Sequence, residues 1–204
     1  MFDKLKRWIT NYFHTRKPFT IITDFLFVLL ILLLLIPGTR KQIAPVFIRI
    51  TSFAPSQLSE NEQYEIGQQT KEWQVMDSKG QVLRFDRFLD KPVFVNFWAT
   101  WCPPCIAELP GIQSLYHEYK GRVHFLLLSN ERFEKINVFA RNHQYENLPF
   151  YRFQSVPDDF SSRSIPTTFV ISKKGKVVLS KKGAARWESD KVRKLLDNLL
   201  TEPN

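Results

Sequence analysis

The feature that most constrains this chain is a pair of cysteines placed between a buried strand and a helix. Residues 93–98 (Val-Phe-Val-Asn-Phe-Trp) form a predominantly apolar run, which is typical of a strand buried on both faces. Cys102 and Cys105 follow, and apolar residues then recur at helical spacing over 103–119. Two thiols separated by two residues at a helix start are close enough to form a small disulfide ring.

The position of each cysteine predicts its chemistry. Cys102 lies at the N-terminal end of the predicted helix, near unpaired N–H groups and the positive end of the helix dipole. Both lower a thiol pKa and favour the nucleophilic thiolate, so Cys102 is expected to be the exposed nucleophile. Cys105, one turn inside, is expected to be shielded and to act as the resolving thiol. Pro103 and Pro104 are tolerated here, since the first turn lacks intrahelical N–H bonds.

The cysteine pair has two other possible interpretations, a zinc site and a structural disulfide. If the two cysteines bound zinc, two further ligands would be needed, because a closed zinc site has four. No second ligand pair is found among the remaining candidates, which are His14, His117, His124 and His143. A purely structural disulfide would close too short a loop to restrict the unfolded chain much. A redox-active pair is therefore predicted, with no metal and no cofactor.

The other elements follow from apolar periodicity and turn residues. A strand is predicted over 123–128, a short extended piece over 150–153, and helices over 133–142 and after the capping residue Ser189. Hairpins are predicted at 73–85 and 168–179. A buried strand followed by a helix, twice, requires parallel crossovers. The predicted class is α/β, with a central mixed sheet flanked by helices and an added N-terminal β-hairpin.

An apolar segment precedes this domain. Residues 19–36 lie between two prolines and contain one charge, Asp24. At 1.5 Å per residue they span about 27 Å, close to a ~30 Å hydrocarbon core. A buried core helix and a cleaved signal peptide are the alternatives, but no small-residue cleavage site follows. A single uncleaved transmembrane anchor is predicted, with the lipid bilayer as a partner.

Charge indicates the orientation of the anchor. Five Lys/Arg residues precede the span and three closely follow it, which favours a cytoplasmic N-terminus and an extracytoplasmic domain. Residues 1–50 carry eight Lys/Arg and two acidic residues, a balance of +6, whereas residues 51–204 have a balance of only +3. The basic charge therefore does not indicate a nucleic-acid-binding face, and no nucleic acid partner is predicted.

The chain is accordingly divided into four parts. These are a cytoplasmic basic tail (1–18), the anchor (19–36), an interfacial segment and linker (37–66), and the globular domain (67–204). Within the linker, a four-residue apolar stripe predicts either a short helix on the membrane surface or an irregular connection: Ile43, Val46, Phe47 and Ile50. Residues 55–67 are read as a polar tether.

Three motifs together resemble a known family. They are residues 97–105 (Phe-Trp-Ala-Thr-Trp-Cys-Pro-Pro-Cys), 108–110 (Glu-Leu-Pro) and 165–169 (Ile-Pro-Thr-Thr-Phe). This combination resembles the membrane-anchored thioredoxin-like proteins of the TlpA/ResA group. The resemblance implies a thioredoxin fold outside the cytoplasm and thiol–disulfide exchange with exported cysteine-containing proteins. Some members reduce apocytochrome c before haem attachment. An upstream membrane thiol reductant is implied as the electron donor.

The resemblance also implies roles for individual residues. Pro166 matches the family's cis-proline beside the cysteines, which would leave the backbone of Ile165 free to pair with a substrate strand. Glu108 matches a partly buried acid that tunes thiol protonation; a first-turn acid facing water is the alternative. Asn96 replaces the buried aspartate of ordinary thioredoxins and is interpreted as a hydrogen-bonded core residue. Trp101 is either a hydrophobic platform for substrate or a lid over the disulfide.

Two other functions, peroxidase and copper chaperone, are alternatives for a pair of cysteines in this fold. Thioredoxin-fold peroxidases place Thr or Ser three residues before the reactive cysteine, where this chain has Ala99. Copper chaperones of the Sco type separate their cysteines by three residues, whereas two separate them here. The prediction is a protein disulfide reductase of the inner membrane, facing the periplasm or extracytoplasmic space, with a peroxidase or copper chaperone as alternatives.

Overall fold

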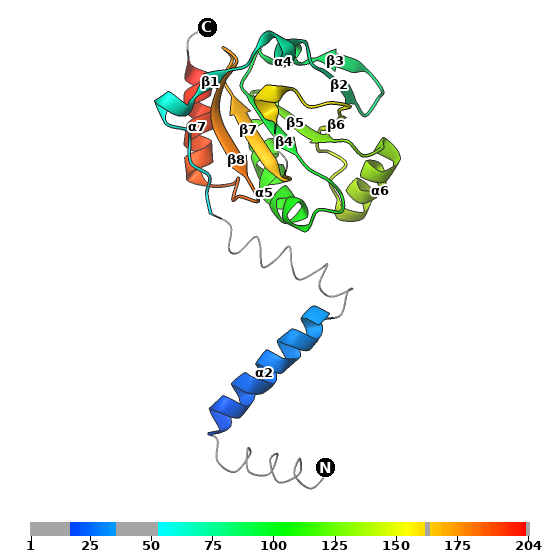
Figure 1. Cartoon of the computed structure of the whole chain (residues 1–204), viewed down its shortest axis with the longest axis vertical. Helices are drawn as coiled ribbons and strands as arrows, with labels where there is room; N and C mark the ends of the chain where they lie inside the picture. The colour runs from blue at the N-terminus through cyan, green and yellow to red at the C-terminus, as the bar shows by residue number, and fades with distance from the viewer. Residues whose placement is uncertain (1–16, 36–52, 162–163, 203–204) are drawn as a thin grey trace. The chain divides into compact units, whose positions relative to one another are not determined.

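The computed structural model describes residues 17–35, 53–161 and 164–202 of the chain (Figure 1). It divides into two compact units, residues 1–43 and residues 44–204. The apolar stripe predicted between residues 43 and 50 lies outside the described residues.

The first unit contains one described helix, α2, over Pro18–Leu35. Proline is tolerated at its start because the first helical N–H groups have no intrahelical partner. Among the residues that the structure describes, no helix is both long enough and apolar enough to cross a membrane, so the predicted anchor is not confirmed.

The second unit is built on one eight-stranded mixed sheet with the order β1-β8-β7-β4-β5-β6-β2-β3. The strands are β1 (Tyr64–Glu65), β2 (Gln74–Asp77), β3 (Val82–Arg84), β4 (Val93–Phe97), β5 (His124–Ser129), β6 (Phe150–Arg152), β7 (Thr167–Ile171) and β8 (Lys176–Lys182). The helices are α4 (Gln68–Glu72), α5 (Pro103–Tyr119), α6 (Phe133–His143), α7 (Asp190–Thr201) and the 3-10 helices η1 (Glu60–Glu62), η2 (Phe85–Phe88) and η3 (Asp158–Phe160).

The predicted parallel crossovers are confirmed. β4 pairs parallel with β5, and β5 pairs parallel with β6. β7 joins β4 antiparallel and β8 joins β7 antiparallel. At the other side of the sheet, β2 pairs antiparallel with both β3 and β6. The connections between the parallel strands contain α5 and α6, as two successive strand–helix units require.

The two faces of the sheet carry two different cores. Alternate strand residues such as Phe94 and Leu127 pack with the apolar stripes of α5, α6 and α7, so these three helices cover one face. The intervening residues, such as Val95 and Leu126, pack with an aromatic cluster that contains Trp73. This two-sided burial explains why the central strands are almost wholly apolar.

The start of the domain differs from the prediction. Residues 55–67 were expected to be a polar tether, but Tyr64 and Glu65 form β1 against β8. Ile66 is buried in the aromatic core, and Asp159 holds the segment by accepting a hydrogen bond from the backbone N–H of Gly67 at 2.7 Å. A two-residue strand has no periodicity to reveal it. Ser189 precedes α7 as predicted, but its side chain makes no capping hydrogen bond.

Candidate active site

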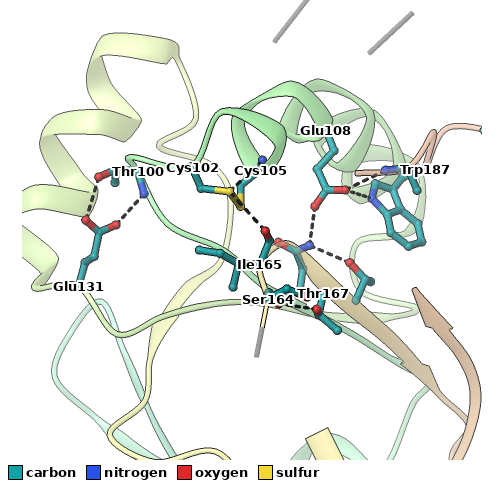
Figure 2. The surroundings of a disulfide bond; sticks show 12 residues. Thr100, Cys102, Cys105, Glu108, Glu131, Ser164, Ile165, Thr167 and Trp187 are labelled. Carbon is teal, nitrogen blue, oxygen red and sulfur yellow. Dashed lines mark hydrogen bonds between the residues drawn. A yellow bond between two sulfur atoms is a disulfide. The ribbon is translucent and has the colours of Figure 1, made fainter. Parts of the chain in front are cut away.

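The two cysteines form a disulfide at the N-terminus of α5, directly after β4 (Figure 2). Cys102 is the N-cap residue, with extended backbone angles, and Cys105 lies in the first turn. The backbone N–H of Cys105 donates a hydrogen bond to Cys102 Sγ, with N and Sγ 3.3 Å apart. This is the geometry that stabilises negative charge on the first sulfur when the pair is reduced.

Cys102 is more deeply buried than predicted. That residue was expected to be exposed, but it is 3% exposed and Cys105 is fully buried. Both belong to the core on the helical face of the sheet, because α5 is pressed against that face from its first turn. Trp101, by contrast, is 65% exposed, so a large apolar surface lies on the outside immediately before the disulfide.

A second segment, at the start of β7, lies against the first sulfur. The Ile165–Pro166 peptide bond is cis, as the resemblance implied. The carbonyl oxygen of Ile165 lies 3.8 Å from Cys102 Sγ. Ile165 is partly buried and contacts the cores on both faces of the sheet. The structure therefore brings Ile165 together with the cysteine pair, although 63 residues separate it from Cys102.

Glu108 is buried on α5, three residues after Cys105, and is 4% exposed. Its Oε1 accepts a hydrogen bond from Asn96 Nδ2 at 2.8 Å. Its Oε2 accepts from Trp187 Nε1 at 2.8 Å and from the backbone N–H of Ala185 at 3.1 Å. Burial raises the pKa of Glu108 from 4.5 to about 7, although all three hydrogen bonds lower it. The interpretation of Glu108 as an acid facing water is wrong.

Asn96 connects β4 to this carboxylate. Its side-chain nitrogen donates to both Glu108 Oε1 and Thr168 Oγ1, each at 2.8 Å. Its Oδ1 has no hydrogen-bond partner among the described residues. The residue was predicted to be a satisfied buried polar group, and the structure supports this only for the nitrogen. Asn96 is instead part of the environment that determines how Glu108 ionises.

A second carboxylate, which sequence reasoning missed, holds the loop before the cysteines. Glu131 accepts hydrogen bonds from the backbone N–H of Thr100 at 2.6 Å and from its hydroxyl at 3.0 Å, and it pairs with Lys135. Burial raises the pKa of Glu131, but the bonds from Lys135 and Thr100 outweigh it and the net pKa is lowered. In Figure 2 the disulfide lies between Glu131 on one side and Glu108 on the other.

Metal ligation has no support in the described part of the chain, where no group of three His, Cys, Asp or Glu side chains is arranged to hold an ion. The chemistry that this arrangement can perform is sulfur exchange. It combines a sulfur at a helix N-terminus, a second sulfur one turn further, and a buried carboxyl group that titrates near neutral pH.

Comparisons with known proteins agree with this chemistry. Residues 66–180 match the AhpC/TSA family. The thiol–disulfide oxidoreductase ResA of Bacillus cereus is 30% identical over 128 residues, which are 61% of this chain and 74% of that protein. The corresponding protein of Bacillus thuringiensis strain Al Hakam is 32% identical over 127 residues, covering 59% of this chain and 71% of the relative.

Solved structures of thiol–disulfide oxidoreductases and thioredoxins are also similar to this chain. A protein assigned as a thiol–disulfide oxidoreductase from Bacteroides vulgatus is 28% identical, with a TM-score of 0.53, covering 62% of this chain and 91% of its own. The exposed lipoprotein thioredoxin Etrx1 of Streptococcus pneumoniae is 25% identical, with a TM-score of 0.53, covering 62% and 98%. With a cysteine pair at the helix N-terminus, this chain belongs to the AhpC/TSA family and is a ResA-like thiol–disulfide oxidoreductase.

Proposed function

We propose that this protein reduces disulfide bonds in exported proteins, apocytochrome c among them, while tethered to the membrane by residues 19–36. The observation that carries the proposal is the position of Cys102 as N-cap of α5, with the N–H of Cys105 directed at its sulfur. A thiolate at this place is stabilised by the helix terminus and is the attacking species in disulfide exchange.

The proposed reaction begins with the reduced pair. The Cys102 thiolate attacks one sulfur of the substrate disulfide, that S–S bond breaks, and the leaving substrate sulfur takes up a proton. The Cys105 thiolate then attacks Cys102 Sγ, which breaks the mixed disulfide and releases the second substrate sulfur as a thiol. Two electrons pass to the substrate, and the pair is left as the disulfide seen in the structure. An upstream membrane thiol reductant restores the dithiol.

Glu108 is proposed to exchange a proton with Cys105. Cys105 must lose its proton before it can attack, yet it is fully buried. Glu108 lies three residues further along α5, and its pKa of about 7 lets it accept or release a proton near neutral pH. An ordinary exposed glutamate has a lower pKa, so its carboxylate would be a weaker base and a poorer acceptor for the Cys105 proton.

Two features are proposed to contact the substrate. The exposed Trp101 provides an apolar surface beside the disulfide. The backbone of Ile165, before the cis-proline, is proposed to pair with an extended substrate segment, which would align the substrate disulfide with Cys102. Its carbonyl lies 3.8 Å from Cys102 Sγ, which supports this placement.

Attachment to the membrane is proposed from the sequence. The apolar segment 19–36 and the excess of Lys/Arg before it favour a cytoplasmic N-terminus and an extracytoplasmic domain. A reporter that is active only outside the cytoplasm, fused after Asn204, should be active. An inactive reporter, beside an active cytoplasmic one at the same site, would contradict this orientation.

Trapping of the mixed disulfide tests the proposed activity. In a Cys105→Ser variant the second attack cannot occur, so covalent complexes between Cys102 and exported cysteine-containing proteins should accumulate and disappear on reduction. The matched control is Cys102→Ser, which should capture little. Equal capture by the two variants, or hydrogen peroxide turnover without any protein capture, would contradict a protein disulfide reductase.

A further inference from the structure

The carboxylate of Glu108 is held largely by one short segment far away in the sequence. Residues 183–187 follow β8 and supply two of its three N–H donors, the Ala185 backbone and the Trp187 indole. Both act on the same oxygen, Oε2, while Asn96 acts on Oε1. Figure 2 shows the Trp187 ring beside Glu108, on the side away from Glu131.

We propose that Trp187 is a positioning residue for Glu108: its indole N–H fixes the carboxyl group and favours the ionised form, which sets how readily Glu108 takes up a proton. The inference rests on the proposed role of Glu108 in proton exchange with the cysteine pair. On this proposal Trp187 acts on the cysteine pair only through Glu108.

Packing alone does not account for the indole at this position. Trp187 is fully buried, and its ring meets Phe94 edge-on with centroids 5.0 Å apart. A phenylalanine could supply that contact. The indole adds a single N–H, and that N–H lies 2.8 Å from Glu108 Oε2. A hydrogen bond to a buried charged group is stronger than one between neutral groups and stabilises the charged form.

The same segment also reaches the cis-proline. The backbone N–H of Gly183 donates to the carbonyl oxygen of Pro166 at 2.8 Å, and Gly183 has a φ of 78°, which favours glycine. Residues 183–187 therefore contact both the carboxylate behind the cysteines and the segment proposed to bind substrate. The segment whose N–H groups hold Glu108 is thus also hydrogen-bonded to Pro166.

Other groups near this carboxylate would not themselves cause a shift in the Glu108 titration when Trp187 is replaced. Asn96 and Thr168, on β4 and β7, do not titrate near neutral pH. Cys105, on the same helix, does not titrate while it is in the disulfide. Glu188 places its carboxylate against the backbone of Gly111, one turn further along α5, and is unchanged in every variant considered below.

The direct test is the titration of the Glu108 carboxyl group in the oxidised full chain, in detergent solution, followed by NMR with a ¹³C carboxyl label on glutamate. The Glu108→Gln variant identifies the signal. The parent should titrate near pH 7, and Trp187→Phe should move the midpoint up by about one pH unit, since one donor to the charged form is lost.

A matched control is available in the same core. Trp98 is also buried, and its Nε1 has no hydrogen-bond partner among the described residues. Trp98→Phe makes the same chemical change without removing a bond, so the Glu108 midpoint should stay in place. If Trp187→Phe does not fold, benzothienylalanine at position 187 keeps the ring shape and removes the N–H. An unchanged midpoint, or equal shifts at 98 and 187, would overturn the inference.

A second readout connects the titration to the thiols. In the reduced protein, Trp187→Phe should move the pH dependence of Cys105 alkylation towards that of Glu108→Gln, and should add nothing in the Glu108→Gln background. An additional shift in the double variant would mean that Trp187 acts independently of Glu108. Both readouts need no substrate, so a failed trapping experiment would contradict the proposed function without deciding this inference.

Discussion

The backbone N–H of Cys105 is directed at the sulfur of Cys102, with N and Sγ 3.3 Å apart. Because the donor belongs to the first turn of α5, negative charge on Cys102 receives both this bond and the field of the helix terminus. The sulfur of Cys105 lies inside the helix and is fully buried, so it is not at the helix terminus.

This asymmetry predicts the order of thiol reactivity. In the reduced protein near neutral pH, an alkylating reagent should modify Cys102 before Cys105, because Cys102 carries the larger thiolate fraction. Mass spectrometry of peptides after short labelling times measures the order. Faster labelling of Cys105 would reverse the assigned roles.

Glu108 should control the protonation of the second thiol. Its carboxylate disfavours a neighbouring thiolate, so Glu108→Gln should move the pH midpoint of Cys105 alkylation to lower pH by about one unit. The change in Cys102 should be smaller, since that sulfur is at the helix terminus. Superimposable profiles for parent and variant would show that Glu108 does not communicate with the pair.

Glu108 should also make stability depend on pH. Its pKa is about 7 in the folded protein against 4.5 for an ordinary glutamate, so the folded state binds this proton more tightly. The resulting stabilisation is complete below about pH 4.5 and is lost as the pH rises through about 7. The loss is on the order of 3 kcal/mol.

Chemical denaturation of the oxidised protein at several pH values measures this dependence. The free energy of unfolding of the parent should fall relative to that of Glu108→Gln as the pH rises from about 4.5 to about 7. A constant difference between the two proteins across this range would mean that the Glu108 pKa is not raised.

Glu131 should hold the loop that leads to Cys102. Glu131→Ala leaves the partly buried N–H of Thr100 without its acceptor, and should lower the free energy of unfolding by about 1–3 kcal/mol. It should also change the rate of Cys102 alkylation. Glu134→Ala is the control, because its ion pair with Arg132 is exposed and should contribute within about 0.5 kcal/mol. Equal losses in the two variants would contradict this role.

The sequence predicted well those elements that depend only on residues close together in the chain. Apolar periodicity and the prolines at its start define α5, whose bounds are those predicted. Glu108 could be placed three residues after Cys105, but its burial depends on Trp187, 79 residues away. Glu131 was missed for the same reason, since its bond to Thr100 joins two loops after different strands. Such contacts leave no pattern in a single sequence.

The Cys102–Cys105 pair is proposed to act as a reductant, and its midpoint potential tests this most directly. Pro103 and Pro104 supply no N–H and no positive charge to the Cys102 thiolate, and the carboxylate of Glu108 opposes thiolate formation. A strongly oxidising pair needs a more stabilised reduced form.

The full chain should be equilibrated in dithiothreitol or glutathione buffers and followed by tryptophan fluorescence, with Trp101→Phe establishing how much of the signal comes from the residue beside the disulfide. We expect a midpoint below roughly −200 mV, nearer to the thioredoxin value of about −270 mV. A midpoint near about −120 mV, the value of a strong oxidant, would contradict the reductant assignment.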